Sequence, residues 1–196
     1  MAHKQVEYEF VDVDLFKHEN LSPSFRAKNP LAQVPALEID GLYLTQSIAI
    51  CEYLEETRPN SSLLPTEPAT RARCRELVEI INAGIQPLQN KSVLEKLNAD
   101  YDDRSIEAIF GDETAWTEED NWPQYWVRKG FAAFEARLAQ TAGRYCIGDS
   151  VTLADVALSP QVTGSRSLYR IDMSAFPTID RIYAALGERP AFANVR

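Results

Sequence analysis

The chain has 196 residues and a formal net charge of −9, with 45% hydrophobic and 25% charged residues. These proportions are typical of globular proteins rather than of disordered or fibrous ones. No run approaches the roughly 20 apolar residues of a membrane span, and the first residues lack the pattern of a secretory signal, so we expect an intracellular protein without a membrane segment. Acidic side chains outnumber basic ones, 29 to 20, so the average surface repels nucleic acid. Cys51, Cys74 and Cys146 share no metal-ligand spacing, and we expect buried thiols and no metal site.

The first sixty residues show the patterns of a small α/β unit. Apolar and acidic residues alternate over 6–15, which predicts a β-strand. Pro23 favours at most a short helix over 23–27, before the stop at Asn29-Pro30. Two short apolar runs joined by Asp40-Gly41 predict a β-hairpin. The helical spacing that follows predicts a helix over 46–57.

A turn-rich stretch at residues 59–65 indicates a boundary between two domains, 1–62 and 66–196. Beyond it the apolar spacing is helical. The pattern predicts helices over 69–97 with a kink at Pro87, near 105–110, over 122–141, from Thr152 onward and over about 178–188. Thr152-Leu-Ala-Asp155 is a capping box, to which we assign a structural role. The predicted fold class is an α/β domain followed by an all-α domain.

Several strings of residues, spread over nearly the whole chain, closely resemble glutathione transferases. They are Asn29–Leu37, Thr45–Ile50, Tyr53–Glu56, Gly84–Asn90 and Gly148–Val156. The string Gly84-Ile-Gln-Pro-Leu-Gln-Asn90 is similar to the zeta class, the maleylacetoacetate isomerases. The resemblance implies a thioredoxin-like N-terminal domain followed by the helical C-terminal bundle of this family. It also implies glutathione as cosubstrate, a homodimer in the full-length protein, and a cytoplasmic location with a mitochondrial form as the alternative.

Pro35 stands where a cis peptide bond would have a physical use. A cis X-Pro bond turns the backbone of the preceding residue outward and offers its N–H and C=O to an extended ligand. The resemblance implies that Val34 pairs in this way with the cysteinyl backbone of glutathione, like an added strand. The residues alone leave open an ordinary proline at the start of a strand. Gln33 and Asn20 fall near the same place, Asn20 where the family often has a Gln that reaches the peptide.

Gln46-Ser47 stands at the opening of a predicted helix. Unpaired N–H groups and the positive end of the helix dipole favour a carboxylate there. The resemblance assigns Gln46 and Ser47 to the γ-glutamyl carboxylate of glutathione. The alternative is a serine that only caps its helix.

Gln86 and Asn90 are four residues apart, which places them on one face of the predicted helix. The resemblance implies that this face, with Lys91 and Ser92, completes the pocket for glutathione and substrate. The alternative is a helix kinked at Pro87 whose polar side chains satisfy the freed carbonyls.

Two arginines are candidates for binding a substrate carboxylate. A guanidinium matches a carboxylate bidentately, which suits a diacid substrate. The resemblance places such an arginine after residues 160–162. The local sequence departs from the family by about one inserted residue, so Arg166 is the first candidate and Arg170 the second. The alternative is a surface arginine.

No catalytic residue of the family can be assigned within the 196 residues. The family begins with a strand and a helix whose first turn carries Ser-Ser-Cys and stabilises the glutathione thiolate, and this motif does not occur here. We therefore expect a shortened chain whose thioredoxin-like domain lacks its first strand. The implied function is glutathione-dependent cis–trans isomerisation of maleylacetoacetate, in phenylalanine and tyrosine catabolism, with little or no activity in the shortened chain. The alternative is a non-catalytic binding or dimerisation module of the same fold.

Overall fold

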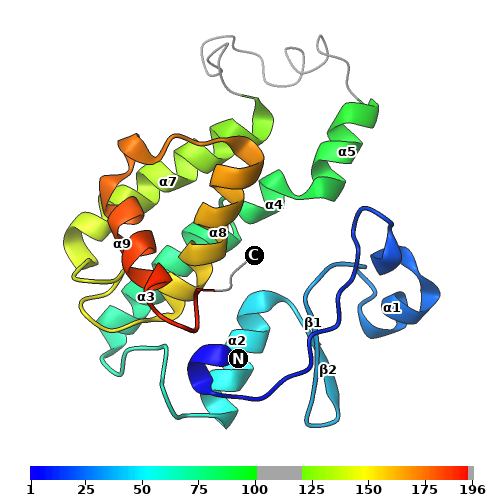
Figure 1. The fold of residues 1–196 in the computed structure, drawn as a ribbon, viewed down its shortest axis with the longest axis horizontal. Helices are drawn as coiled ribbons and strands as arrows, with labels where there is room; N and C mark the ends of the chain where they lie inside the picture. The colour runs from blue at the N-terminus through cyan, green and yellow to red at the C-terminus, as the bar shows by residue number, and fades with distance from the viewer. Residues whose placement is uncertain (101–120, 194–196) are drawn as a thin grey trace. The chain divides into compact units, whose positions relative to one another are not determined.

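The computed structural model describes residues 1–100 and 121–193 of the chain. The chain divides into two compact units, unit 1 (Met1–Leu63) and unit 2 (Leu64–Arg196). Figure 1 shows their elements coloured along the chain. Among the described residues, no helix is both long and apolar enough to span a bilayer. The helix predicted near 105–110 lies outside the described residues.

Unit 1 is built around one hairpin and one helix. Its elements are the short helices η1 (Ala2–Lys4), η2 (Glu19–Leu21) and α1 (Pro23–Lys28), the strands β1 (Ala36–Ile39) and β2 (Leu42–Thr45), and α2 (Ser47–Thr57). The strands pair antiparallel, and the predicted Asp40-Gly41 turn is confirmed. Both turn residues have positive φ, 51° and 77°, as a two-residue type I′ turn requires. Ile50 and Leu54 of α2 are buried, and α2 contacts β2.

The strand predicted over residues 6–15 is wrong. Residues 6–14 join no β-ladder, and 15–18 form a turn. The sheet of the described chain contains β1 and β2 alone. The side chains of Tyr8, Phe10 and Val11 are 56%, 79% and 71% exposed. Alternation gives an extended segment two faces, but a strand forms only where its N–H and C=O groups bond to a neighbouring strand, and no described strand pairs with this segment.

A buried ion pair joins η1, at the start of unit 1, to the last part of α2. Lys4 Nζ lies 2.6 Å from Glu55 Oε1, with both side chains more than nine-tenths buried. The ammonium also donates to two carbonyls, and the second carboxylate oxygen accepts two hydrogen bonds; the partners are Arg58 O (2.8 Å), Asn60 O (3.2 Å), Ser62 Oγ (2.8 Å) and Leu63 N (3.0 Å). Burial alone would raise the pKa of Glu55, but these donors hold it below its ordinary value.

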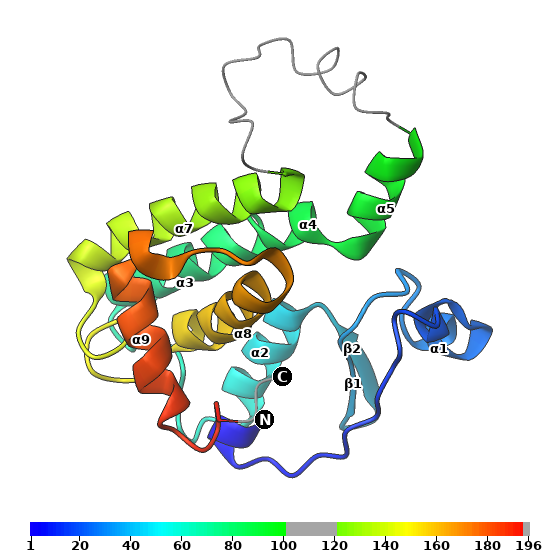
Figure 2. The same cartoon turned by 45° about the horizontal axis from the view of Figure 1, so that its top comes forward.

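Unit 2 is helical. Its elements are α3 (Pro68–Asn82), α4 (Gln86–Gln89), α5 (Lys91–Asp100), α7 (Trp122–Thr141), α8 (Leu153–Tyr169), η3 (Met173–Ala175) and α9 (Pro177–Gly187). Figures 1 and 2 show α3, α7 and α8 side by side with α9 against them. The side chains between these helices are fully buried; among the largest are Leu77, Ile81, Phe131, Phe134, Leu158, Ile179 and Ile182. The helices predicted over 122–141, from Thr152 and over 178–188 are confirmed.

The helix predicted over 69–97 is interrupted twice. The first break follows α3, near Gly84, where an added Cβ would lie 2.6 Å from the carbonyl oxygen of Ile80. The second break is Asn90, whose φ of −62° and ψ of 136° are extended rather than helical. Pro87 lies inside the short α4 between the two breaks. The kink is therefore a separate one-turn helix.

The buried carboxylate of Asp155 ties the start of α8 to the loop before it. Its Oδ2 accepts from the N–H (2.8 Å) and the hydroxyl (3.0 Å) of Thr152, and its Oδ1 accepts from Cys146 N–H (2.9 Å). Asp155 itself is 0% exposed. The predicted capping box is present, and the hydrogen bonds of its carboxylate join residues of unit 2.

Candidate functional site

The loop that leads into β1 presents the backbone of Val34 to solvent. The Val34-Pro35 peptide bond is cis, as the resemblance implies. Val34 is 45% exposed. The β-ladder begins two residues later, at Ala36, and within the described chain no residue hydrogen-bonds to the N–H or C=O of Val34. An extended ligand can therefore pair with this backbone without breaking a bond of the fold.

Two asparagines hold this loop in shape. Asn29 is 2% exposed; its Nδ2 donates to the carbonyl of Gln33 (2.6 Å) and its Oδ1 accepts from Leu31 N–H (3.1 Å). Asn20 Nδ2 donates to the carbonyl of Ala32 (2.7 Å), while its buried Oδ1 has no partner among the described residues. Sequence reasoning treats Asn29 only as a stop before Pro30. Its signal is the tendency of Asn to bond the backbone two residues on.

Gln46 and Ser47 stand at the opening of α2, as predicted. Gln46 is the N-cap residue and Ser47 the first helical residue; no side chain caps this end, and its first turn carries no acidic residue. Ser47 makes no hydrogen bond to the described chain through its hydroxyl, so the purely capping alternative finds no support. The uncapped N–H groups and the positive end of the dipole are complementary to a carboxylate.

The hairpin register brings these two features together. Ala36 pairs with Thr45. Pro35, just before Ala36, and Gln46, just after Thr45, therefore lie at the same end of the hairpin. The outward backbone of Val34 and the first turn of α2 are thus neighbours within unit 1. The pair suits a peptide that carries a carboxylate.

The second group of predicted residues lies on unit 2, around the turn between α4 and α5. Because Asn90 leaves the helix, the prediction that Gln86 and Asn90 share one helix face is wrong. Asn90 Oδ1 instead accepts from the N–H (3.1 Å) and the hydroxyl (2.9 Å) of Ser92. Lys91 Nζ lies 3.3 Å from Oε1 of Glu95, which is one helical turn further along α5. Asn90 joins α4 to α5, and with Lys91 and Ser92, the first two residues of α5, it forms the 90–92 turn, with Gln86 at the opposite end of α4.

The two candidate arginines differ in their surroundings. Arg166, on α8, forms an ion pair with Asp180 of α9, and its guanidinium lies 4.9 Å from the ring centroid of Tyr183. Arg170 follows the last residue of α8 with a φ of 52°, and its side chain has no ion pair within the described ranges. Both side chains are exposed, so the difference is that one guanidinium nitrogen of Arg166 already bonds Asp180.

None of the three cysteines is placed as an activated thiol. Burial raises the pKa of Cys51, Cys74 and Cys146 above their ordinary value, while reactive thiols are those whose pKa is lowered. In the described chain, no group of three or more His, Cys, Asp or Glu side chains is arranged to hold a metal ion.

Comparison with known proteins agrees with both units. The family profile for the glutathione S-transferase N-terminal domain matches residues 1–56, and that for the C-terminal domain matches residues 102–194. The maleylacetoacetate isomerase of Rattus norvegicus is 43% identical over 194 residues, which are 98% of this chain and 82% of that protein.

Two solved structures resemble the chain along most of their length. A maleyl pyruvate isomerase, described as a bacterial glutathione S-transferase in the zeta class, has a TM-score of 0.84 and 39% identity over 98% of this chain and 86% of its own. A maleylacetoacetate isomerase from Methylobacterium extorquens AM1, with bound malonate and GSH, has a TM-score of 0.82 and 34% identity over 97% of this chain and 85% of its own.

Proposed function

Because the chain belongs to the glutathione S-transferase family, with zeta-class relatives along nearly its whole length, we propose that it serves glutathione-dependent cis–trans isomerisation of maleylacetoacetate. The observation that carries the proposal is the outward backbone at the cis Val34-Pro35 bond beside the uncapped start of α2. A relative of the same fold holds GSH together with malonate, a small diacid. The substrate class proposed is therefore a diacid, and the isomerisation proposed requires that it carry a double bond.

In this proposal the protein binds and orients its two ligands. The N–H and C=O of Val34 pair with the peptide backbone of glutathione, with Asn20 and Gln33 beside them. The first turn of α2, with Gln46 and Ser47, holds the γ-glutamyl carboxylate. When bound, glutathione supplies a thiolate that adds reversibly to the cis double bond, so that the carbon–carbon axis can rotate before elimination.

Unit 2 contributes the remaining ligand side chains of the proposal. Gln86 and the turn of Asn90, Lys91 and Ser92 are assigned to glutathione and substrate. The guanidinium of Arg166 or Arg170 is assigned to a substrate carboxylate, held bidentately. Substituting each arginine in turn by leucine separates the two. Replacing the arginine that binds the substrate carboxylate should raise KM for the diacid, whereas replacing the other should leave KM unchanged.

Ser47 offers the most direct test of binding. Ser47→Ala should weaken glutathione binding by roughly 1–3 kcal/mol, the scale of one hydrogen bond to a charged group. Ser24→Ala is the matched control, since Ser24 is an exposed serine that bonds only to Ser22 in the described chain. Unchanged affinity of Ser47→Ala by calorimetry would remove Ser47 from the site.

We further propose that the 196-residue polypeptide alone turns over poorly. A free thiol with a pKa near 8.5 is only a few per cent thiolate at neutral pH, and the sequence contains no Ser-Ser-Cys to stabilise that anion. An extended form, in which the family's Ser-Ser-Cys segment precedes Met1, should isomerise at least about a hundredfold faster. Comparable turnover in both forms contradicts this proposal.

The rival is a binding or dimerisation module without catalysis. It predicts glutathione binding with no turnover even in the extended form, whereas the isomerase proposal predicts both. We also propose that the extended form is a homodimer and that the 196-residue polypeptide dimerises more weakly. A sharp dimer of the shorter form, measured by light scattering at micromolar concentration, contradicts that part.

A further inference from the structure

We propose that two glutamine side chains, the half-buried Gln89 on α4 and the buried Gln161 on α8, act together as a positioning pair for the turn at residues 90–92. The inference rests on the proposed function, which assigns this turn to glutathione and substrate. It concerns side chains that do not touch the ligand in that proposal. Their effect is exerted through the backbone that follows α4.

The short helix α4 has no means of holding its own place. It has four residues, no side chain caps its N-terminus, and the chain leaves helical geometry at Asn90. Isolated helices much longer than this are marginal in water. The orientation of α4, and of the turn after it, must therefore come from contacts with other elements of unit 2.

The two amides face each other and satisfy each other. Gln89 Nε2 donates to Gln161 Oε1 (3.0 Å), and Gln161 Nε2 donates to Gln89 Oε1 (3.1 Å) and to Ser165 Oγ (3.0 Å). Gln161 is 2% exposed and Ser165 is 0% exposed. Since a buried polar group without its partners is costly, a shift of α4 away from α8 would deprive the buried Gln161 amide of both bonds to Gln89 and leave it only the bond to Ser165 on its own helix.

The last carbonyls of α4 are also bonded from outside. The Tyr169 hydroxyl, at the end of α8, donates to the carbonyl of Gln89 (3.1 Å), and Trp122 Nε1, at the start of α7, donates to the carbonyl of Leu88 (2.7 Å). Gln124 Nε2 in turn donates to the carbonyl of Tyr169 (3.0 Å). Helix ends leave such carbonyls without partners. Here side chains of α7 and α8 provide the partners.

The position of Gln89 determines where the 90–92 turn begins. Asn90 follows Gln89 in the chain, and Asn90 Oδ1 accepts from the N–H and the hydroxyl of Ser92. The next helix starts from the same residue, since Val93 and Leu94 donate to the carbonyl of Asn90. The amide pair, together with the bonds from Tyr169 and Trp122, thus holds the residue from which the turn and α5 both start.

The experiment replaces Gln161 by methionine, which keeps the length of the side chain and removes its polar atoms. In Gln161→Met, backbone amides 88, 89, 93 and 94 should exchange about tenfold faster, and the Kd for glutathione should rise about tenfold, as for one lost buried hydrogen bond. In the extended form, KM for glutathione should rise by a similar factor while kcat stays within about threefold, because binding rather than chemistry is affected.

Thr163→Val is the matched control. Thr163 lies two residues along α8, and its hydroxyl bonds to the hydroxyl of Tyr183 on α9 (3.0 Å) rather than to α4. It should lower the melting temperature without changing glutathione affinity or the exchange of amides 88–94. The double variant Gln89→Met/Gln161→Met leaves no amide unpaired and should recover stability, but not affinity.

Unchanged exchange at amides 88–94 in Gln161→Met, or faster exchange with unchanged glutathione affinity, overturns the positioning role. If neither the 196-residue chain nor the extended form binds glutathione, the proposed function fails instead. In that case exchange alone decides whether the pair orders the turn.

Discussion

The two units solve the problem of backbone hydrogen bonding in opposite ways. In unit 2 the helices satisfy their own N–H and C=O groups, and their apolar faces meet over fully buried side chains such as Phe131, Phe134 and Ile179. In unit 1 the backbone of residues 6–14 has no ladder partner in the described chain. Most of the exposed large apolar side chains are also in unit 1, including Phe10 at 79% and Phe16 at 84%.

This difference follows from the range of the interactions that each unit needs. A helix is completed by residues four positions away, so it forms wherever its apolar face finds a partner. A strand is completed by another strand, which the local sequence does not contain. The stability of unit 1 therefore depends on a few specific polar contacts, here called clasps. They are the Lys4–Glu55 ion pair and the hydrogen bonds of Asp40 to Tyr53 and Arg58. The stability of unit 2 depends instead on its apolar core.

Hydrogen exchange should show the largest difference between the units. Backbone amides of α3 from Leu77 onward should exchange about a thousandfold more slowly than those of residues 6–15, because core helices open only with global unfolding, while a segment that joins no β-ladder of the described chain opens without it. Mass spectrometry of peptides from the two regions measures this ratio. Comparable protection at residues 6–15 and in α3 would show that the first segment pairs with a neighbour in solution.

The same contrast explains how much could be predicted from the sequence. The hairpin over 36–45 and the helices over 122–141 and 177–187 depend on neighbours within one turn or one loop, and the sequence predicts them. The strand over 6–15 is wrong because alternation cannot show whether a partner strand is present. Apolar periodicity likewise continues through Asn90, where the helix ends.

The candidate site shows the same limit. The residues alone leave the cis bond before Pro35 open, and the family resemblance is what favours it. Asn29 and Gln161 escape sequence reasoning because their partners are visible only once the loop and the helices are folded. Gln46 and Ser47 are predicted correctly at a helix start because that feature is local.

The next largest effect is expected at Asp155, the buried carboxylate of unit 2. Asp155→Asn keeps the shape but turns an NH2 group toward donors that need an acceptor, so unit 2 should lose about 3 kcal/mol of unfolding free energy. Urea unfolding followed by tryptophan fluorescence reports on this unit, because all three tryptophans follow residue 64. Asp172→Asn is the control: Asp172 caps η3 at the surface, and its loss should cost under about 1 kcal/mol. Equal losses in the two variants contradict the role of burial.

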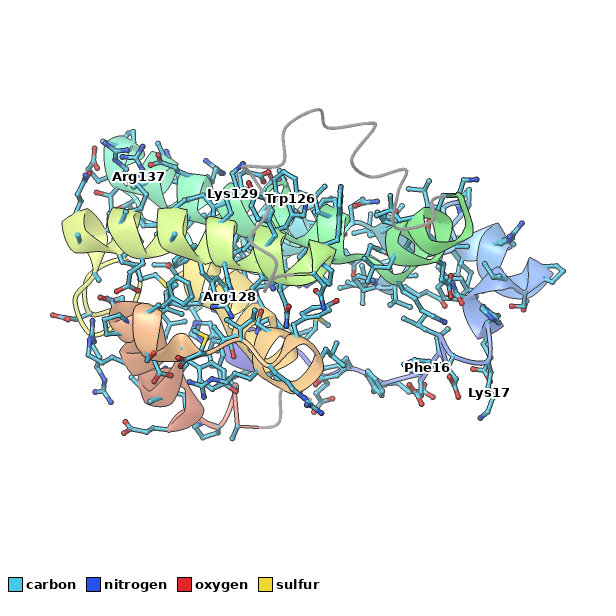
Figure 3. The ribbon with its side chains drawn as sticks, turned by 90° about the horizontal axis from the view of Figure 1, so that it is seen from above. Phe16, Lys17, Trp126, Arg128, Lys129 and Arg137 are labelled. Atoms are coloured by element: carbon cyan, nitrogen blue, oxygen red, sulfur yellow. The ribbon has the colours of Figure 1, made fainter. Side chains whose placement is uncertain are left out.

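A smaller effect is expected at the clasp of unit 1. Lys4→Met fills the same space but leaves Glu55 with only the Ser62 and Leu63 donors, so local stability should fall by about 2 kcal/mol. Exchange of two amides measures it without interference from unit 2: that of Ile50 in α2, bonded to the carbonyl of Gln46, and that of Arg58 just after α2, bonded to the carbonyl of Leu54. Lys17→Met is the matched control, since Lys17, labelled in Figure 3, pairs with Asp14 while its side chain is 75% exposed. That exposed pair should contribute close to nothing.

The smallest expected effect concerns the pH dependence of the hairpin clasp. The Arg58 guanidinium lies 2.5 and 2.7 Å from the two oxygens of Asp40, and the Tyr53 hydroxyl donates at 2.6 Å. These bonds, with that of Arg58 the strongest, lower the pKa of Asp40 from 3.8 to about 2. Because the folded pKa is depressed, the contribution of this carboxylate is fully present about one pH unit above 3.8 and is lost as the pH falls through the folded value of about 2.

Asp40→Asn isolates this contribution, since asparagine tolerates the positive φ of the turn. The difference in hairpin amide exchange between the unaltered chain and Asp40→Asn should be constant from about pH 7 to 5, should decline as the pH falls further, and should vanish only below about pH 2. It should also shrink in 1 M salt, because the pair is partly exposed, with side chains 29% and 43% accessible. The Lys4–Glu55 pair, being buried, should keep its effect at that salt concentration. A carboxyl titration of Asp40 by NMR with a midpoint near 4 would mean that the clasp does not form, leaving the hairpin held by its own ladder and by the contact of β2 with α2.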